Sequence, residues 1–316
     1  MDASSLHTPV MLERCLELLA PVASRDGAVV VDATLGMGGH AEQLLERHPG
    51  LTLVGIDRDP DAIRLAGERL ARFGDRIRIV QHVYDELEES LEDAGVDRLD
   101  GILFDLGVSS LQLDDAERGF AYSKDAPLDM RMGREGTTAA DLVATLDERE
   151  LSRIMHRYGD ERLASRYARA IVRERQERPI LTSAHLVDVL DAATPAAARK
   201  QGHVAKRVFQ ALRIVVNDEL GVLERAMPNA LDALDDGGRI VVMAYQSLED
   251  RIVKHALRDA TTDSTPLGVP AALPEHAAPY RLLLRGAEMA DEAERARNPR
   301  SIPVRLRAAE RIGGGA

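Results

Sequence analysis

Hydrophobic positions in the first third of the chain gather into short runs that are rich in β-branched residues. Four such runs are expected as strands, at residues 28–32, 51–57, 76–80 and 99–105. The segments between them have apolar residues at helical spacing, over residues 40–47, 60–72 and 85–94. Because strands alternate with helices, we expect a parallel sheet with right-handed crossovers.

The alternation stops after the fourth run and resumes later in the chain. No convincing strand pattern occurs over residues 113–207, where the spacing predicts helices at 151–158, 164–178 and 183–192. A long helix over 207–226 then leads to a strand at 238–244, a helix from 248, and final strands at 280–285 and 302–307. The sequence therefore predicts an α/β domain in two parts, residues 1–112 and 208–316, interrupted by an all-helical insertion, residues 113–207.

Composition places the chain among soluble folded proteins. Hydrophobic residues make up 45% of the 316 residues and charged residues 30%, and no run approaches the ~18 consecutive apolar residues that a membrane span needs. Residues 1–9 lack the pattern of a secretory signal, so a cytoplasmic protein without a membrane partner is expected. The single cysteine, Cys15, excludes an intrachain disulfide and a cysteine-based zinc site, and no metal site is expected.

Net charge argues against a nucleic-acid partner, but the charge is segregated along the chain. The total is 41 − 53 = −12, whereas phosphate neutralisation requires Lys and Arg. Every charged residue within 85–97 is acidic. Within 192–216 every charged residue is basic, namely Arg199, Lys200, Lys206, Arg207 and Arg213. We expect local RNA contact at this basic run. For the arginine-rich helix over 162–178, a solvated face is the favoured interpretation.

A glycine-rich turn follows the first expected strand and reads Asp32-Ala-Thr-Leu-Gly-Met-Gly-Gly-His-Ala41. Glycines let the backbone approach a ligand, and the next helix offers free N–H groups. Asp57 ends the second strand, where a carboxylate can accept hydrogen bonds from both hydroxyls of a ribose. A dinucleotide and S-adenosylmethionine both fit this spacing. Asp32 favours the methyl donor, because a carboxylate there attracts a cationic amino-acid tail and repels a pyrophosphate.

Several segments together resemble one protein family. They are His7–Glu13, the turn 32–40, Asp57–Ala62, Asp105–Asp114, Arg118–Phe120, Asp125–Met132, Tyr158–Arg162, Phe209–Ile214 with Asn217, and Ser247–Lys254. In these segments the chain closely resembles the bacterial 16S ribosomal RNA cytidine N4-methyltransferase family (RsmH/MraW). The resemblance implies a class I, Rossmann-like, S-adenosylmethionine-dependent methyltransferase domain with an inserted helical domain. It also implies methyl transfer to the exocyclic N4 of a cytidine in the decoding region of 16S rRNA, within the small ribosomal subunit.

The same resemblance implies the cofactor contacts. Carried over by position, they are Gly38, Gly39, His40, Asp57, Tyr84, Asp105 and Gln112. Glycines would let the chain pass beside the cofactor, and Tyr84 would cover the adenine face. His40, at a helix start, is expected to stay neutral because the helix dipole disfavours imidazolium.

Transfer to an exocyclic amine needs no covalent enzyme intermediate. Cys15 is expected in an early helix away from the strand ends, which argues against a cysteine nucleophile. Asp105 is the catalytic candidate, since an acceptor there can hold the amine N–H groups. The sequence continues Leu-Gly-Val where amino-methyltransferases commonly carry Pro-Pro and an aromatic residue, which leaves the stacking ring open. Phe120 and Tyr122 are candidates, although a buried structural role is favoured for both.

Two further departures from the family's pattern concern the end of the chain. Tyr245-Gln246 stands where the family commonly has Phe-His, and Ser301–Arg305 replaces a Ser-Ala-Lys-like run. No catalytic role is therefore assigned to a histidine at that point. A methyltransferase for another RNA or a metabolite, and a non-catalytic RNA-binding assembly factor, remain alternatives. The sequence also leaves open whether the chain forms a homodimer.

Overall fold

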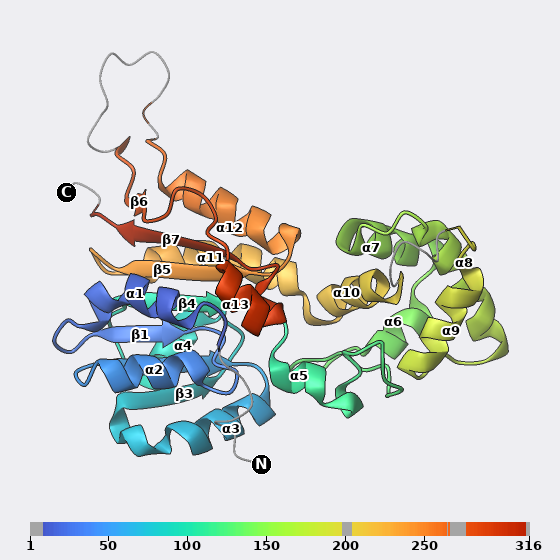
Figure 1. Ribbon diagram of the computed structural model, residues 1–316, viewed down its shortest axis with the longest axis horizontal. Helices are drawn as coiled ribbons and strands as arrows, with labels where there is room; N and C mark the ends of the chain where they lie inside the picture. The colour runs from blue at the N-terminus through green and yellow to red at the C-terminus, as the bar shows by residue number, and fades with distance from the viewer. Residues whose placement is uncertain (1–8, 198–203, 264, 266–275, 314–316) are drawn as a thin grey trace. The chain divides into compact units, whose positions relative to one another are not determined.

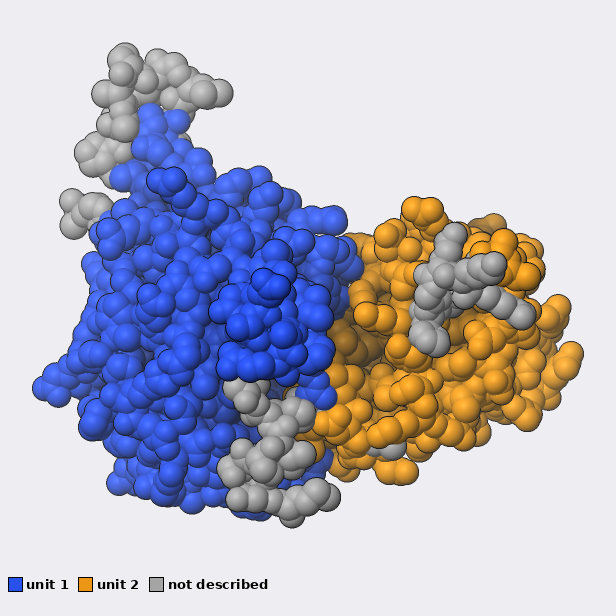
Figure 2. Space-filling view, in the orientation of Figure 1, with its two compact units in different colours: residues 1–107, 220–316 blue, residues 108–219 orange. Residues whose placement is uncertain are grey.

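The computed structural model describes residues 9–197, 204–263, 265 and 276–313, and the chain divides into two compact units (Figures 1 and 2). Unit 1 comprises residues 1–107 and 220–316, and unit 2 comprises residues 108–219. The helical insertion expected from the sequence, residues 113–207, thus has a counterpart that begins earlier and ends later. Residues 108–112 and 208–219, which the sequence assigned to the α/β domain, belong to unit 2.

Unit 1 is built on a seven-stranded sheet (Figure 1). Its strands are β1 (Val29–Asp32), β2 (Thr52–Asp57), β3 (Ile77–Gln81), β4 (Gly101–Asp105), β5 (Arg239–Ala244), β6 (Tyr280–Leu282) and β7 (Arg305–Arg311). The spatial order is β3-β2-β1-β4-β5-β7-β6. Strands β1 to β5 are parallel, whereas β7 runs antiparallel to both β5 and β6. The predicted α/β class with a parallel sheet is confirmed.

Helices cover both faces of this sheet. One face packs on α1 (Leu12–Ala23), α2 (Gly39–Arg47) and α3 (Pro60–Leu70), and the other on α4 (Leu87–Ala94), α11 (Glu219–Ala233) and α12 (Ser247–Ala260). Successive strand residues point to opposite faces, so Val30 joins the first layer while Val29 and Val31 join the second. Strands buried on both faces read as continuous apolar runs, which is why the sequence revealed them.

The position of β1 in the sheet indicates where a ligand is expected to bind. The chain runs from β1 outward to β2 and β3, and then returns to place β4 on the other side of β1. At such a reversal the connecting helices leave opposite faces, so a ligand crevice opens beyond the carboxyl ends of the strands. Asp32 and Asp105 end β1 and β4, and Asp57 ends β2.

The described part of unit 2 consists of helices, loops and one isolated bridge between Pro127 and Thr182. Its helices are α5 (Ser110–Asp114), α6 (Ala139–Thr145), α7 (Glu148–Gly159), α8 (Ala164–Glu177), α9 (Ser183–Ala193) and α10 (Val204–Asn217). They enclose a separate core that includes Tyr167, Leu186 and Val208. Tyr167 is fully buried, and its hydroxyl forms a 2.9 Å hydrogen bond with the Thr194 hydroxyl.

The single long helix predicted over residues 207–226 is wrong. The chain forms α10 and α11 instead, and Asp218 between them adopts a left-handed conformation with φ of 49°. The buried side chain of Asn217 turns away to bind the backbone of Met130 and Met132. Because that contact involves residues far away in the sequence, helical periodicity could not reveal the break.

The boundaries of the final strands also differ from expectation. The strand expected over 302–307 is β7, Arg305–Arg311. Residues Pro299–Ser301 form a 3-10 turn that continues into Ile302, and Pro303 lacks the N–H that a sheet ladder needs. The strand expected over 280–285 ends at Leu282. No helix within the described residues is both long and apolar enough to cross a membrane.

Candidate active site

Asp32 ends β1 with its side chain almost completely inside the protein. The residue is 2% exposed, and Oδ1 accepts the backbone N–H of Thr34 at 3.2 Å. Burial raises the pKa of Asp32 to about 7, and the charges of Asp105 and Asp57 act in the same direction. This carboxyl is therefore costly to ionise unless a cation approaches it.

Asp57 holds the glycine turn to the end of β2. Its Oδ2 accepts the backbone N–H of Gly36 at 2.8 Å, and its Oδ1 accepts that of Asp59 at 2.9 Å. Burial nevertheless raises the pKa of Asp57 to about 6, because these two hydrogen bonds offset only part of the desolvation. Each oxygen keeps a second lone pair that can accept a ligand hydroxyl.

Gly38 and Gly39 are required first by packing within unit 1. Gly38 precedes α2 with φ of +75°, and a Cβ there would lie 3.0 Å from Leu70 Cδ1. A Cβ on Gly39 would lie 2.6 Å from Pro9 Cγ. Side chains at either position would push the turn and α2 away from the segments beside them. The glycines thereby keep the N-terminus of α2 close to the end of β1.

His40 lies in the first turn of α2 and points toward Asp105. Its Nε2 is 3.2 Å from the carbonyl oxygen of Val10, which can only accept, so this nitrogen carries the hydrogen. Burial, rather than the helix dipole, is the main reason that the pKa of His40 is lowered. The neutral ring then turns the lone pair of Nδ1 toward Asp105 Oδ2, at 3.9 Å.

Asp105 is held at the end of β4 by two hydroxyl groups. Its backbone N–H donates to Thr34 Oγ1 at 2.6 Å, and its Oδ1 accepts the hydroxyl of Tyr245 at 2.6 Å. Burial raises the pKa of Asp105, whereas His40 and the Tyr245 hydroxyl oppose that rise. The side chain stays 28% exposed, so a substrate group can reach it.

Six of the seven residues carried over from the resemblance lie in unit 1, close to the ends of its strands. Tyr84 follows β3, and its ring meets Phe104 of β4 edge-on, with centroids 5.6 Å apart. The seventh, Gln112, lies in unit 2 near the start of α5. Its Oε1 accepts the backbone N–H of Ser109 at 3.1 Å, so it caps this helix.

Three carboxyl groups therefore converge on one edge of the sheet, with the neutral ring of His40 beside one of them. Among the described residues, no Lys or Arg forms an ion pair with Asp32, Asp57 or Asp105. Such a site disfavours phosphate groups and favours a cation. A ligand with a sulfonium, an ammonium and a ribose diol fits these residues, whereas a pyrophosphate does not.

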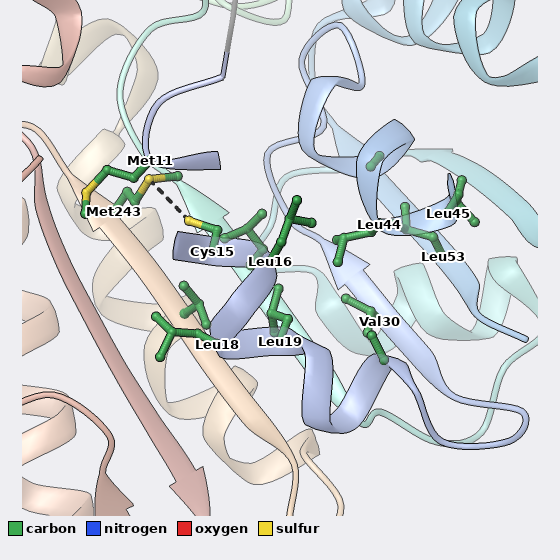
Figure 3. Packing of buried hydrophobic residues seen from close by; sticks show 14 of the residues in the cluster. Met11, Cys15, Leu16, Leu18, Leu19, Val30, Leu44, Leu45, Leu53 and Met243 are labelled. Atoms are coloured by element: carbon green, nitrogen blue, oxygen red, sulfur yellow. Dashed lines mark hydrogen bonds between the residues drawn. The ribbon is translucent and has the colours of Figure 1, made fainter. Parts of the chain in front are cut away.

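The sequence placed Cys15 away from the strand ends, and this is wrong. Figure 3 shows the thiol of Cys15 beside Met243 of β5, with 3.7 Å between the two sulfur atoms. Met243 is the register partner of Asp105. Cys15 is 1% exposed, and burial raises its thiol pKa well above the usual range. Burial, and not distance, is what argues against a cysteine nucleophile.

The basic run expected to contact RNA is only partly described. Arg199 and Lys200 lie outside the described residues. Arg207 Nε donates to Glu161 Oε2 at 2.6 Å, and Arg213 pairs with Glu219 at 2.7 Å. These two arginines therefore help to hold unit 2 together, and Lys206 remains as an exposed cation of the run.

The arginine-rich helix, α8, uses several of its cations for structure. Arg175 donates to the carbonyl oxygens of Val143 and Leu146, and Arg166 donates to that of Ala193. Arg169 is 74% exposed and lies 3.4 Å from Glu148. Carbonyl groups at helix ends thus engage two of the six arginines over residues 162–178.

Two aromatic candidates for base stacking belong to the core of unit 2. Phe120 is 7% exposed, and Tyr122 meets Phe209 edge-on with centroids 6.1 Å apart. The buried structural interpretation is therefore favoured for both.

Two contacts of Asp105 escaped sequence reasoning. They come from Thr34 and from Tyr245, which stands 140 residues further along the chain. The available signal for each was a hydroxyl residue within two positions of the end of an expected strand.

Known proteins match this chain over nearly its whole length. The profile of the MraW methylase family matches residues 4–312. A relative from Clavibacter michiganensis subsp. michiganensis is 61% identical over 312 residues, covering 98% of each chain, and one from Leifsonia xyli subsp. xyli is 62% identical over 307 residues, covering 97% of this chain and 94% of the relative. Both are named ribosomal RNA small subunit methyltransferase H.

Among solved structures, an rRNA methylase from Streptococcus thermophilus aligns over 97% of this chain and 99% of its own, with 12% identity and a TM-score of 0.44. The family profile and the two relatives confirm the resemblance inferred from the sequence. The chain belongs to the MraW methylase family.

Proposed function

We propose that this chain is an S-adenosylmethionine-dependent methyltransferase that acts on the exocyclic N4 of a cytidine in the decoding region of small-subunit rRNA. The observation that carries the proposal is the cluster of Asp32, Asp57 and Asp105, none of which forms an ion pair with a lysine or arginine among the described residues. The names of the close relatives support rRNA of the small subunit as the substrate.

The cofactor-binding residues are Gly38, Gly39, His40, Asp57, Tyr84, Asp105 and Gln112. Asp57 accepts the ribose hydroxyls while its backbone hydrogen bonds fix the turn that carries Gly36. Asp32 lies in the same cluster and stabilises positive charge on the ligand. When bound, S-adenosylmethionine supplies an electrophilic methyl group on its sulfonium sulfur.

Asp105 orients the target amine and accepts its proton. A carboxylate oxygen that accepts an N4–H directs the nitrogen lone pair, and N4 loses one proton for each methyl group gained. Asp105 is 28% exposed on its side chain, so this oxygen can reach a bound base. Cys15 takes no part, because its buried thiol stays protonated.

Unit 2 binds the RNA, and a ribosomal substrate places the enzyme in the cytoplasm. The basic run around Arg199 and Lys200 supplies phosphate contacts. Arg207 and Arg213 stabilise unit 2 from the same run. Attraction to RNA is therefore local despite the net charge of −12.

The test uses purified protein, methyl-labelled cofactor and small subunits from cells that lack this protein. Digestion of the rRNA and mass spectrometry of the nucleosides should show N4-methylcytidine at one site. Transfer RNA and free nucleosides serve as alternative substrates, and subunits from wild-type cells serve as the methylated control. D105A should bind subunits normally and methylate them at least about a hundredfold more slowly.

Two outcomes would contradict the proposal. Cells that lack the protein would show normal N4 methylation while the purified enzyme is inert on their subunits. Alternatively, the cofactor would bind tightly without turnover, and D105A would behave like the wild type. The first outcome would point to another substrate, and the second to an assembly factor that binds the cofactor without catalysis.

A further inference from the structure

Tyr245 and Asp105 meet at the ends of neighbouring strands. Met243 of β5 is the register partner of Asp105, and Tyr245 follows β5 by one residue. The Tyr245 hydroxyl donates to Asp105 Oδ1 at 2.6 Å. Its backbone N–H donates to Glu249 Oε2 at 2.9 Å, and its ring passes within 3.7 Å of the position a Cβ on Gly107 would take. Contacts to both the backbone and the ring of Tyr245 therefore fix the position of its hydroxyl.

The other carboxylate oxygen of Asp105 has no hydrogen-bond donor among the described residues. His40 Nδ1 is the basic atom beside Oδ2, and the 3.9 Å between them is too long for a hydrogen bond. Nε2 of that ring already donates to Val10. Thus Oδ1 is engaged by a hydroxyl, while Oδ2 remains free to accept a hydrogen from a ligand.

We infer that Tyr245 is a positioning residue for methyl transfer: its hydroxyl holds the Asp105 carboxylate ionised and in one orientation, so that Oδ2 receives the hydrogen of the target amine. This inference rests on the proposed function, because it identifies the donor to Oδ2 as the N4–H group. A phenylalanine at this position could not make the hydrogen bond that Tyr245 donates.

The surroundings of Asp105 explain why one hydroxyl has a measurable effect. Burial raises the pKa of this carboxyl, and only His40 and Tyr245 oppose the rise. Because burial lowers the pKa of His40, the ring is neutral and contributes little charge near neutral pH. The hydroxyl of Tyr245 then becomes the main group that favours the ionised carboxylate.

Other titratable groups nearby are acidic and remain in place when Tyr245 is changed. Asp32 lies at the end of β1, and its pKa is raised chiefly by burial and further by the charge of Asp105. The pKa of the Cys15 thiol on α1 is likewise raised first by burial and then by the charge of Asp105. The charge of Glu249 on α12 contributes to the raised pKa of Tyr245. The charge of Glu294 on α13 (Glu292–Arg297) favours higher pKa values for His40 and Cys15. None of these groups replaces a lost hydrogen bond to Oδ1.

The test compares the pH dependence of wild type and Y245F in single-turnover methylation of undermethylated small subunits. Loss of a hydrogen bond to a charged group should move the acidic limb of the rate to higher pH by about one unit. Above that limb the rate of Y245F should return to within about threefold of wild type, because Asp105 is again ionised. An acidic limb at the wild-type pH would overturn the inference.

A second readout does not depend on turnover. Carbon-13 labelling of aspartate carboxyl groups, with the Asp105 signal assigned by its absence in D105N, reports ionisation of Asp105 in the cofactor-free protein. The pH at the midpoint of the Asp105 titration should be higher in Y245F than in wild type, again by about one unit. An unchanged midpoint would also overturn the inference, whatever the activity.

Tyr280 offers a matched control in the same unit. Its buried hydroxyl donates to the backbone carbonyl of Leu231, far along the chain from Asp105. Y280F removes the same atom and should leave both the acidic limb and the Asp105 midpoint unchanged. A shift in Y280F equal to that of Y245F would mean that any buried hydroxyl has this effect, and would overturn the inference.

A variant that preserves the shape of the ring guards against misfolding of Y245F. Site-specific 3-fluorotyrosine at position 245 is a stronger donor, so it should move the acidic limb to lower pH. An unmoved or higher limb would contradict the inference. Failure of wild type to methylate subunits would overturn the proposed function instead, whereas an active wild type with unshifted variants overturns only the role of Tyr245.

Discussion

The side-chain oxygen of Asn217 accepts the backbone N–H of Met132 at 2.8 Å, and so joins segments 85 residues apart in the chain. The amide of Asn217 also donates to the carbonyl oxygens of Met130 and Arg213. Met130 has φ of +64° and is fully buried, a strained conformation for a side chain of this size. One asparagine thus satisfies the buried backbone of a strained loop and ends α10.

Replacing Asn217 with alanine should destabilise unit 2. Each buried backbone group left without a partner costs about 1–3 kcal/mol, so N217A should lower the melting temperature and speed hydrogen exchange at the Met132 amide. N229A is the control, because the exposed side chain of Asn229 also binds a backbone carbonyl. Equal melting temperatures for N217A and N229A would contradict this prediction.

Cofactor affinity should depend on pH through Asp57. Burial raises the pKa of this carboxyl to about 6, and the ionised form is the better acceptor for ribose hydroxyls. Affinity for S-adenosylmethionine should therefore fall as pH drops below about 6, by up to roughly tenfold per pH unit. Calorimetry from pH 5 to 8 measures this. D57N should bind weakly with a flatter profile, and an unchanged slope in D57N would assign the dependence to another group.

Asp32 should lower the stability of the cofactor-free protein at neutral pH. Its folded pKa, about 7, exceeds the ordinary 3.8, so the folded state binds the proton more tightly. The free energy of unfolding therefore falls as pH rises through that interval. D32N removes this loss and should raise the melting temperature at pH 8 by at least about 2 °C, while weakening cofactor binding. If the free energy of unfolding of D32N fell with pH as steeply as that of wild type, the assignment to Asp32 would be contradicted.

Charge reversal at Arg199 and Lys200 should weaken RNA binding without unfolding unit 2. Loss of two phosphate contacts should reduce the slope of log affinity against log salt by about 1–2, measured with small subunits between 50 and 300 mM salt. R207A is the contrasting variant, because Arg207 pairs with Glu161, which is 1% exposed. It should lower the melting temperature instead. An unchanged salt slope in R199E/K200E would remove this segment from the interface.

The sheet was predictable because its signal is local. Strands β1, β2, β4 and β5 are mostly buried on both faces, so apolar runs such as Val29–Asp32 can be recognised to within one or two residues. The break at Asp218 and the position of Cys15 against Met243 were not predictable, since each depends on a partner more than 80 residues away.

The candidate site divides in the same way. Asp57 and Asp105 follow recognisable strands, and the geometry of parallel strands brings their ends together. The hydrogen bond from Tyr245 depends on the register of β4 against β5, which no local pattern encodes. The raised pKa values of Asp32 and Asp57 depend on burial, which sequence alone could only assume.

The place of β7 between β5 and β6 has a consequence for synthesis of the chain. Strands β1 to β4 leave the ribosome first, followed by the whole of unit 2, residues 108–219, before β5 appears. At about 5–20 residues per second, roughly 10 s pass before β5 is made, and until then the backbone N–H and C=O groups along one edge of β4 have no strand partner. Unit 2 is continuous in sequence and can complete its own core during that interval. The last strand then closes the sheet, so unit 1 matures only after unit 2.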